Sequence, residues 1–313
     1  MELFSKYISE MSKKAVLIGI NYIGTNIELY GCINDMLQIQ NLLIYVYGYK
    51  HENIVFLRDD DPSNMPTRNN IIGKLKDLVA SKPSEYMICY SGHGTNYKDM
   101  NSDEKDGIDE YIVPCDVRSA GCIVDDELNI VLRGLFKTPG LALFDCCRSG
   151  TVLDLQYEGV SSELSTERGL ICISGCMDSE LASETVDAVT QLPQGAMTSA
   201  FLKVLREKGY NIPINTIWNE LLKVLKEQGF SQRPYLTSSV PVNVSTPYPI
   251  VSIVDIISSD YLKRSITLQN LIKNLQGQVV NANNAINRLN TQIMGLQKVI
   301  SQQNIELSKR RKI

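Results

Sequence analysis

The stretch Leu-Ala-Leu-Phe-Asp-Cys-Cys-Arg-Ser-Gly, residues 141–150, decides how the rest of the sequence is interpreted. Its first half is an apolar run typical of a strand buried on both faces, and its second half is a polar turn ending in glycine. Asp145, Cys146 and Cys147 therefore come where a buried strand ends. Ligands bind at the carboxyl ends of strands in open α/β sheets, so a cysteine here is a candidate nucleophile.

Strands and helices alternate on both sides of this stretch. Apolar runs predict strands at residues 15–20, 53–57, 85–90, 110–114, 140–144, 170–174 and 233–237. Apolar residues at helical spacing predict helices at 34–45, from 67 onward, and at 126–135, 195–207 and 216–228, with Asn34 as the cap of the first. This alternation is typical of a mainly parallel sheet with helices on both faces, whose strands have their carboxyl ends at one edge.

Length and composition indicate a soluble globular chain. The 313 residues, of which 43% are hydrophobic and 21% charged, are enough for one large or two ordinary domains. No apolar run is long enough for a signal peptide or a membrane span, so we expect a cytoplasmic protein without membrane contact. The eight cysteines are expected to be free thiols, with Cys89 and Cys172 as small buried side chains. The only histidines, His51 and His93, argue against a zinc cluster.

Charge is distributed unevenly along the chain. Residues 262–313 carry nine Lys or Arg and one Glu, a charge of +8, so the total of −4 leaves −12 for residues 1–261. An acidic body favours cations and basic substrates, and we expect no nucleic-acid partner.

A heptad pattern of apolar residues runs through residues 265–308. The alternating steps of four and three predict a coiled-coil tail that self-associates or binds a partner helix. The alternative is that the same stripe packs back onto the body as one long helix. The basic end, residues 309–313, suits a helix C-terminus.

A Ser-Gly-His-Gly turn, residues 91–94, follows the strand predicted at 85–90. It is expected at the same sheet edge as Asp-Cys-Cys, which brings the His93 imidazole close to a thiol. An imidazole lowers the pKa of a neighbouring thiol and can then protonate a leaving group. The flanking glycines allow backbone N–H groups to approach a developing oxyanion. The two turns together predict nucleophilic catalysis by cysteine.

Taken in order, these motifs resemble the metacaspases, caspase-fold cysteine proteases that cleave after Arg or Lys. The matching segments are Gly-Ile-Asn-Tyr (19–22), Gly-Cys-Ile-Asn-Asp (31–35), Ser-Gly-His-Gly (91–94), Asp-x-Cys-x-Ser-Gly (145–150), Gly-Ala-Met-Thr (195–198), Gln-Arg-Pro (232–234) and Leu-Thr-Ser-Ser (236–239). The resemblance implies that His93 is the base and Cys147, the third residue of Asp-x-Cys, the nucleophile, with Cys146 as a packing residue. Arg148 departs from the pattern, which has His in most members.

The resemblance also implies a domain plan and a fold class. The fold class is α/β, a caspase-like, mostly parallel sheet with helices on both faces, followed by the coiled-coil helix. The expected parts are an N-terminal extension (1–13), a peptidase domain (14–245) with a large-subunit-like part (14–157), a linker (158–169) and a small-subunit-like part (170–245), and a second linker (246–264) before the tail. A zymogen of this kind cleaves itself, and Arg168, Lys13 and Lys14 are candidate sites.

A pocket for a basic side chain follows from the same resemblance. Its substrate-binding residues correspond to Cys32, Asp35, Ser91 and Asp145, and its substrates are proteins or peptides with Arg or Lys at the cleaved position. Carboxylates with further acceptors suit a guanidinium or ammonium group. Asp35 by itself could equally be an acid at a helix N-terminus.

Calcium activation is a further implication of the resemblance. The ligands correspond to Asp109, Asp125, Asp126 and Asp154, and the ion would order the loop after the nucleophile. The alternative makes Asp125 a helix cap and Asp154 a solvated loop acid. An EF-hand over residues 99–110 is rejected, because Glu104 stands where the loop needs glycine.

The sequence thus predicts a calcium-dependent, Arg/Lys-specific cysteine endopeptidase capable of autoprocessing. The alternative function is a catalytically silent scaffold that is oligomerised by its coiled-coil tail.

Overall fold

The computed structural model describes residues 12–98, 107–146, 151–158, 168–175, 184–186 and 192–245. The chain divides into two compact units, Met1–Ser259 and Asp260–Ile313. The second unit, with the predicted coiled coil 265–308 and basic end 309–313, lies outside the described residues, as does the linker 246–264. The domain boundaries and the coiled coil therefore stay predictions.

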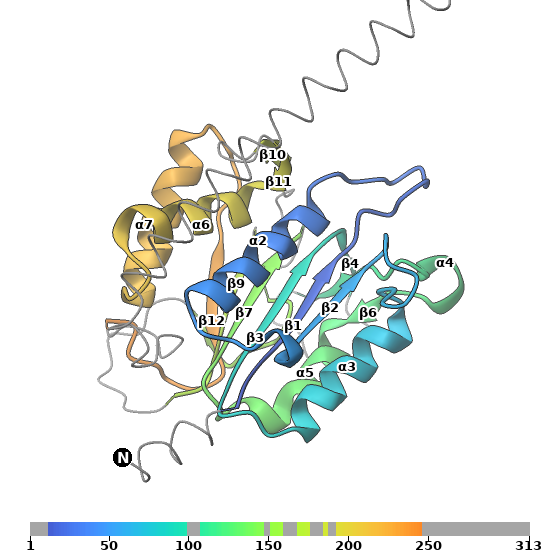
Figure 1. The fold of residues 1–313 in the computed structure, drawn as a ribbon, viewed down its shortest axis with the longest axis horizontal. Helices are drawn as coiled ribbons and strands as arrows, with labels where there is room; N and C mark the ends of the chain where they lie inside the picture. The colour runs from blue at the N-terminus through green and yellow to red at the C-terminus, as the bar shows by residue number, and fades with distance from the viewer. Residues whose placement is uncertain are drawn as a thin grey trace, which may run out of the picture. The chain divides into compact units, whose positions relative to one another are not determined.

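A seven-stranded sheet forms the centre of the first unit (Figure 1). Its order is β2-β1-β3-β7-β9-β12-β8, with bounds Ile54–Arg58, Lys13–Gly19, Glu85–Ser91, Gly140–Asp145, Leu170–Ser174, Tyr235–Ser238 and Tyr157–Glu158. The strands from β2 to β9 in this order are parallel, and β12 pairs antiparallel with both of its neighbours, β9 and β8. The expected mostly parallel sheet is confirmed, and β1, β3, β7 and β9 end at one edge.

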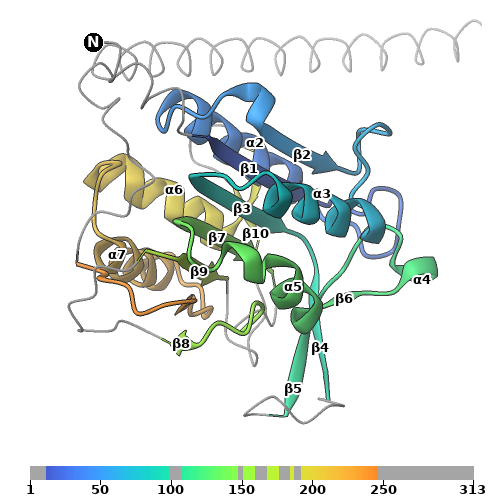
Figure 2. The same cartoon turned by 90° about the horizontal axis from the view of Figure 1, so that it is seen from below.

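Helices cover both faces of this sheet (Figures 1 and 2). One face carries α2 (Cys32–Tyr45), α6 (Ala196–Lys208) and α7 (Ile214–Glu227), and the other carries α3 (Arg68–Ala80) and α5 (Asp125–Leu132). Short helical pieces add α4 (Val117–Ala120) and two 3₁₀ turns, η1 (His51–Asn53) and η2 (Arg133–Leu135). Among the described residues, no helix is long and apolar enough to cross a bilayer.

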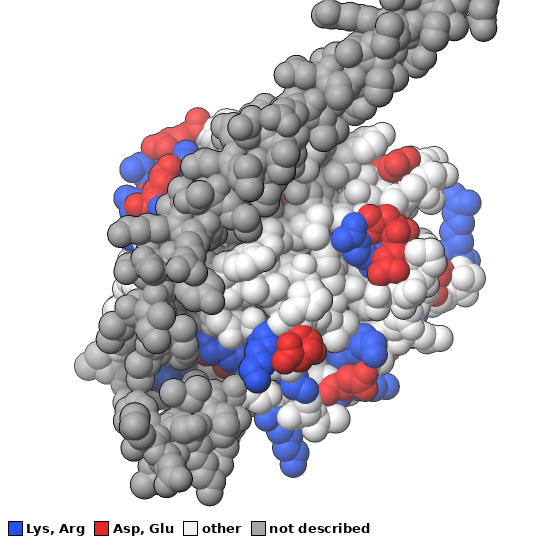
Figure 3. Space-filling model, in the orientation of Figure 1, with Lys and Arg blue, Asp and Glu red and all other residues white. Residues whose placement is uncertain are grey.

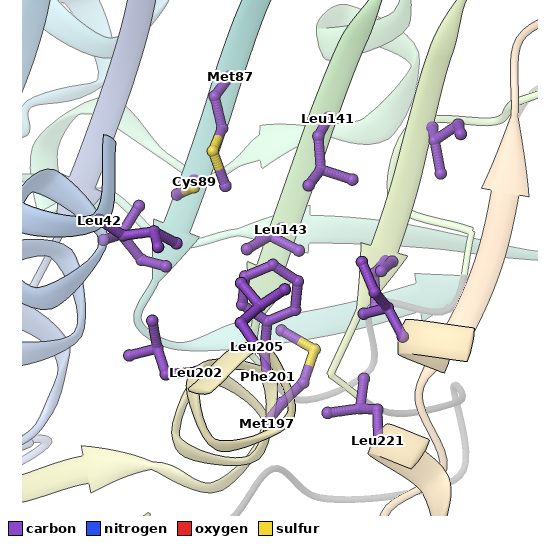
Figure 4. Close-up of a cluster of buried hydrophobic side chains, with 14 of the residues drawn as sticks. Leu42, Met87, Cys89, Leu141, Leu143, Met197, Phe201, Leu202, Leu205 and Leu221 are labelled. Atoms are coloured by element: carbon purple, nitrogen blue, oxygen red, sulfur yellow. The ribbon is translucent and has the colours of Figure 1, made fainter. Parts of the chain in front are cut away.

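Two apolar cores explain why the central strands read as continuous apolar runs. Leu141 and Leu143 of β7 face the α6 side, whereas Ala142 and Phe144 face the α3 side. Figure 4 shows the first of these cores, in which Phe201 of α6 lies against β7. A strand buried on both faces has no polar positions, so the run is uninterrupted.

The cysteine expectations hold where the structure describes them. Cys89 and Cys172 are 0% and 2% exposed and pack in opposite cores. The six described cysteines are free thiols.

One predicted strand lies outside the main sheet. The strand expected at 110–114 is β5 (Ile108–Ile112), which pairs antiparallel with β4 (Gly94–Lys98) and β6 (Ile123–Val124) in a separate sheet. Figure 2 shows β4 and β5 extending away from the main sheet. The connections on either side are too short for the crossover that a parallel neighbour needs, so the chain returns as a hairpin.

The expected cap of α2 is also wrong. The helix begins at Cys32, with Gly31 in the N-cap position, so Asn34 lies inside the first turn. Its side-chain amide donates to the carbonyl oxygen of Pro193, 3.0 Å away. Asn34 thus ties α2 to the β10–β11 hairpin, Glu184–Val186 and Pro193–Gly195.

Lys, Arg, Asp and Glu side chains are interspersed on the described part of the face in Figure 3. Neither sign gathers there into a continuous patch.

Candidate active site

The predicted site residues come together where β3 and β7 end. Ser91 and Asp145 are Cα partners in the parallel pairing of these strands, and His93 follows Ser91 by two residues. Asp35 reaches the same place from the first turn of α2, where its Oδ2 accepts a hydrogen bond of 2.6 Å from the Ser91 hydroxyl. Cys147 and Arg148 lie outside the described residues.

Asp35 and Asp145 are buried carboxylates that converge on Gly195. Asp35 is 0% exposed and Asp145 is 5% exposed. The Gly195 N–H donates to both oxygens of Asp35, at 3.0 and 3.1 Å. A Cβ at position 195 would lie 2.2 Å from Asp145 Oδ2 and 2.9 Å from Asp35 Oδ2. Only glycine fits between the two acids, and both approach the same Cα.

Asp145 is oriented by the start of α6. Its Oδ2 accepts hydrogen bonds from the backbone N–H and the hydroxyl of Thr198, at 2.8 and 2.7 Å. Thr198 lies in the first turn of α6, where the helix dipole favours a negative charge. Neutral donors of this kind hold a carboxylate in its charged form. Gly195 and Thr198 belong to the Gly-Ala-Met-Thr motif, and their contacts with the two acids could not be predicted from that motif.

Cys32, the fourth predicted pocket residue, is the first residue of α2 and is 4% exposed. It precedes Asp35 by three positions, so the two side chains share a face of the helix. The four predicted pocket residues therefore come from α2, β3 and β7 at one edge of the sheet.

The His93 imidazole has a defined hydrogen-bond partner. Its Nε2 lies 2.8 Å from the carbonyl oxygen of Ile27, in the loop between β1 and α2. A carbonyl oxygen only accepts, so Nε2 carries the proton, and in the neutral ring Nδ1 is left as the acceptor. This tautomer leaves Nδ1 available for a thiol proton. A backbone carbonyl leaves no residue-type signal, so the sequence does not reveal Ile27.

Three acids gather beside the loop that includes residues 151–155. Glu110, Asp125 and Asp154 each offer a carboxylate oxygen, and these atoms lie within 4.8 Å of one another. Asp125 and Asp154 are two of the four ligands implied by the resemblance. The other two, Asp109 and Asp126, are not in this group. Asp109 accepts a hydrogen bond from the Tyr111 hydroxyl at 3.2 Å, and the Asp126 N–H donates to Asp125 Oδ1 at 2.8 Å.

This acidic group is buried and electrostatically strained. Burial, with a smaller contribution from the charge of Asp109, raises the pKa of Asp125 to about 6, although hydrogen bonds from Glu110 act to lower it. Both carboxylate oxygens of Asp154 are buried, so the solvated-acid alternative is wrong. Val124 occupies the N-cap of α5 and Asp125 is the first helical residue, so the cap alternative is wrong as well.

The donor set fits a hard divalent cation, because all three residues supply carboxylate oxygens and the charge of a cation would offset their mutual repulsion. The Thr151 hydroxyl donates to Glu110 Oε2 at 2.6 Å and thereby ties the loop to β5. In the sequence, Glu110 is the last residue of the rejected EF-hand pattern and the first of a predicted strand, and neither marks it as a ligand of this group. An acid that is 0% exposed within a strand is the signal that singles it out, and exposure is not visible in the sequence.

Comparison with known proteins identifies relatives of the chain. The family profile described as metacaspase, peptidase C14 domain, matches residues 13–156. A metacaspase-1 of Cryptococcus neoformans is 35% identical over 297 aligned residues, which cover 74% of this chain and 64% of that protein. A metacaspase-1 of Meyerozyma guilliermondii is 33% identical over 299 residues, covering 74% of this chain and 71% of the relative. The chain thus spans 64% of the length of the Cryptococcus relative.

A solved structure shares the fold. The crystal structure of a protein from Geobacter sulfurreducens superposes with a TM-score of 0.55 at 20% sequence identity, covering 77% of this chain and 98% of that one. At this identity the likeness concerns the fold alone.

Proposed function

This chain belongs to the metacaspase family, and we propose that it is a cysteine endopeptidase that cleaves peptide bonds after Arg or Lys. The observation that carries the proposal is the convergence of two buried carboxylates, Asp35 and Asp145, on Gly195 beside the turn that bears His93. Two like charges this close repel each other, and a guanidinium or ammonium group between them turns that repulsion into two attractions.

The reaction we propose uses His93 and Cys147. Nδ1 of His93 takes the thiol proton, and the sulfur forms a bond to the carbonyl carbon of the substrate. Backbone N–H groups near Gly94 and Cys147 stabilise the oxyanion. When the C–N bond breaks, His93 returns the proton to the leaving amine. A water molecule then hydrolyses the acyl-enzyme, again with His93 as base, and the thiol is regenerated.

Asp145 supports specificity through its chain position as well as its contacts. It precedes Cys147 by two residues, so a basic side chain bound there lies next to the bond that is attacked. The decisive experiment measures cleavage of Arg-, Lys- and neutral-ended fluorogenic peptides by the full chain, with and without calcium. Cleavage only after basic residues supports the proposal. No cleavage under either condition supports the silent-scaffold alternative.

We extend the proposal to calcium, which would be held by Glu110, Asp125 and Asp154. When bound, the ion supplies positive charge that holds the loop beginning at Thr151 against β5, and it takes no part in bond breaking. This loop follows Cys147 by four residues, so its order bears on the nucleophile. The support is the all-oxygen donor set and the raised pKa of Asp125, which reports local negative charge and burial.

Glu110→Gln should weaken calcium binding at least about tenfold, because it replaces an anionic ligand with a neutral amide. Calorimetric titration with CaCl₂, carried out in a Cys147→Ala background that prevents self-cleavage, measures this. Asp126→Asn is the matched variant, since Asp126 is implied by the resemblance but lies outside the group of three. If Asp126→Asn weakens binding and Glu110→Gln does not, the three-acid site is wrong and the aspartate set is right.

Autoprocessing after Arg168 should occur between molecules. The Gly140 N–H donates to the Gly169 carbonyl at 3.2 Å, at the start of β7, whereas Cys147 comes after the last residue of that strand. Six strand residues separate the two ends by about 20 Å. A chain cannot bring the bond after Arg168 to its own thiol while β9 stays paired.

We therefore expect the initial rate of self-cleavage to rise with the square of enzyme concentration, and Arg168→Ala to remove the fragment. Gel analysis of a dilution series measures the rate. A rate per molecule that is independent of concentration would contradict an intermolecular step. Lys13 is a poor site by comparison, because its ammonium group is buried against Glu85 Oε1 at 3.4 Å and the Tyr47 carbonyl at 2.9 Å.

A further inference from the structure

Tyrosine hydroxyls hold both polar groups of the His93 peptide backbone. The His93 N–H donates to the hydroxyl of Tyr22, 2.9 Å away. The hydroxyl of Tyr90 donates to the His93 carbonyl at 2.7 Å. Tyr22 follows β1 and Tyr90 lies on β3, so two neighbouring strands of the main sheet fix one residue of the turn.

The same hydroxyls also bind Val113, the residue after β5. Tyr22 donates to the Val113 carbonyl at 2.7 Å, and the Val113 N–H donates to the Tyr90 hydroxyl at 3.2 Å. The Tyr22 proton is thus used toward Val113, and its oxygen is left to accept from His93. Tyr22 and Tyr90 are 2% and 0% exposed, and their hydroxyls lie 3.2 Å apart. The result is a closed, buried ring of hydrogen bonds that joins His93 to Val113.

His93 needs such a restraint because it stands between two glycines. Glycine backbones are the most mobile of all. The Val113 N–H donates directly to the His93 carbonyl at 3.2 Å, and the tyrosine hydroxyls add bonds to the His93 N–H and to the same carbonyl. The two hydroxyls also explain why residue 92 is a glycine. A Cβ at position 92 would lie 2.7 Å from the Tyr90 hydroxyl oxygen and 3.0 Å from that of Tyr22. The space beside Gly92 is the space that the two hydroxyls occupy.

Tyr22 contacts the imidazole itself as well as the backbone. The two ring centroids are 4.7 Å apart, with a 40° angle between the planes. Tyr22 holds this place at a backbone φ of +53°, the left-handed region that a bulky residue seldom adopts. Strain of this kind persists where the surrounding contacts require it. Burial raises the pKa of both phenols well above the ordinary value, so they remain protonated donors at neutral pH.

We propose that Tyr22 is a positioning residue for His93. Its hydroxyl bridges the His93 N–H and the Val113 carbonyl. Its ring limits the imidazole to the orientation in which Nε2 donates to the Ile27 carbonyl. The Tyr90 hydroxyl makes the corresponding bridge between the His93 carbonyl and the Val113 N–H. The catalytic consequence rests on the proposed function, because it needs His93 to act as the base. The positioning of the His93 imidazole by Tyr22 does not depend on the proposed function.

Tyr22→Phe keeps the ring and removes the hydroxyl. It should lower kcat about tenfold or more and leave KM within about twofold, because a slight displacement of the base slows proton transfer without touching the acidic pocket. The matched control is Tyr86→Phe. Tyr86 lies on the same strand as Tyr90, is 0% exposed, and donates to the Leu135 carbonyl at 3.2 Å, away from His93. It should keep the wild-type kcat.

The second readout observes His93 directly. The chain has two histidines, so ¹⁵N-histidine labelling gives two sets of imidazole signals, and His51, exposed in the first 3₁₀ turn, is the internal reference. In the full chain with wild-type sequence, His93 should give one narrow set. Tyr22→Phe should broaden or split the His93 signals and leave those of His51 unchanged, whereas Tyr86→Phe should change neither.

The outcomes separate this proposal from the proposed function. If the wild type cleaves no basic peptide, the function fails, and the imidazole signals still test the positioning. The proposal is overturned if Tyr22→Phe leaves the His93 signals narrow and unsplit. It is also overturned if Tyr22→Phe and Tyr86→Phe lower kcat equally and in proportion to their loss in Tm.

Discussion

Cys147→Ala should abolish cleavage of an Arg-ended fluorogenic peptide, lowering kcat by at least about 10³-fold. An alanine has no electron pair to attack the carbonyl, and loss of the nucleophile removes the covalent route that His93 serves. The measurement is initial rate against substrate concentration at saturating calcium. Alkylation by iodoacetamide, followed by peptide mapping, identifies in the wild type which thiol is the reactive one.

Cys146→Ala is the matched control, one residue away. Cys146 is 1% exposed and packs in the core that contains Tyr90 and Phe144. Its loss leaves a small cavity, so Tm should fall while the cleavage rate stays near that of the wild type. The reverse pattern, with Cys146→Ala inactive and Cys147→Ala active, would assign the nucleophile to the other cysteine.

The parallel core of the fold could be predicted because its strands are buried on both faces. Runs such as residues 140–144 contain only apolar residues and glycine. Such a run is too short for a typical helix, so it predicts a strand. The short strands could not be predicted in the same way. β10, β11 and β6 have two or three residues each, and backbone pairing defines them without any apolar pattern.

In the candidate site, too, some groups could be predicted from the sequence and others could not. His93 and Asp145 could be placed at one sheet edge from the order of the strands, and the family resemblance added Asp35 to the pocket. The groups that orient them could not, because the Gly195 N–H and the Ile27 carbonyl belong to the backbone and carry no residue-type signal. Tyr22 belongs to the Gly-Ile-Asn-Tyr motif, but its hydrogen bonds with His93 and Val113 span 71 and 91 residues of sequence.

One strand connects the acidic group with the His93 turn. Glu110 lies on β5, and Val113, one residue beyond the end of that strand, is part of the hydrogen-bonded ring at His93. The proposals nevertheless predict separate phenotypes. Glu110→Gln should change calcium affinity, and Tyr22→Phe should lower kcat even when calcium is saturating.

Asp145→Asn should remove the preference for Arg over a neutral side chain of the same shape. Citrulline is that neutral side chain, so the ratio of kcat/KM for Arg- and citrulline-ended peptides isolates the charge. Loss of one partner of a buried charge pair costs about 2–5 kcal/mol, which corresponds to roughly 30-fold to several thousand-fold. We expect the Arg peptide to lose this factor and the citrulline peptide to be cleaved as before.

Asp145 is the better of the two acids for this test. One of its oxygens, Oδ2, accepts both bonds from Thr198, so the asparagine oxygen can keep them. In Asp35 both oxygens accept from the Gly195 N–H, and an amide there would set a second donor against that N–H. Asp77→Asn on α3, whose side chain is 71% exposed, removes the same charge at the surface and should leave the ratio unchanged. Alkylation of Cys147 at the wild-type rate would show that the dyad of the Asp145→Asn variant is intact. If that variant also retains the wild-type ratio of kcat/KM for the Arg and citrulline peptides, the acid pair does not select the basic residue.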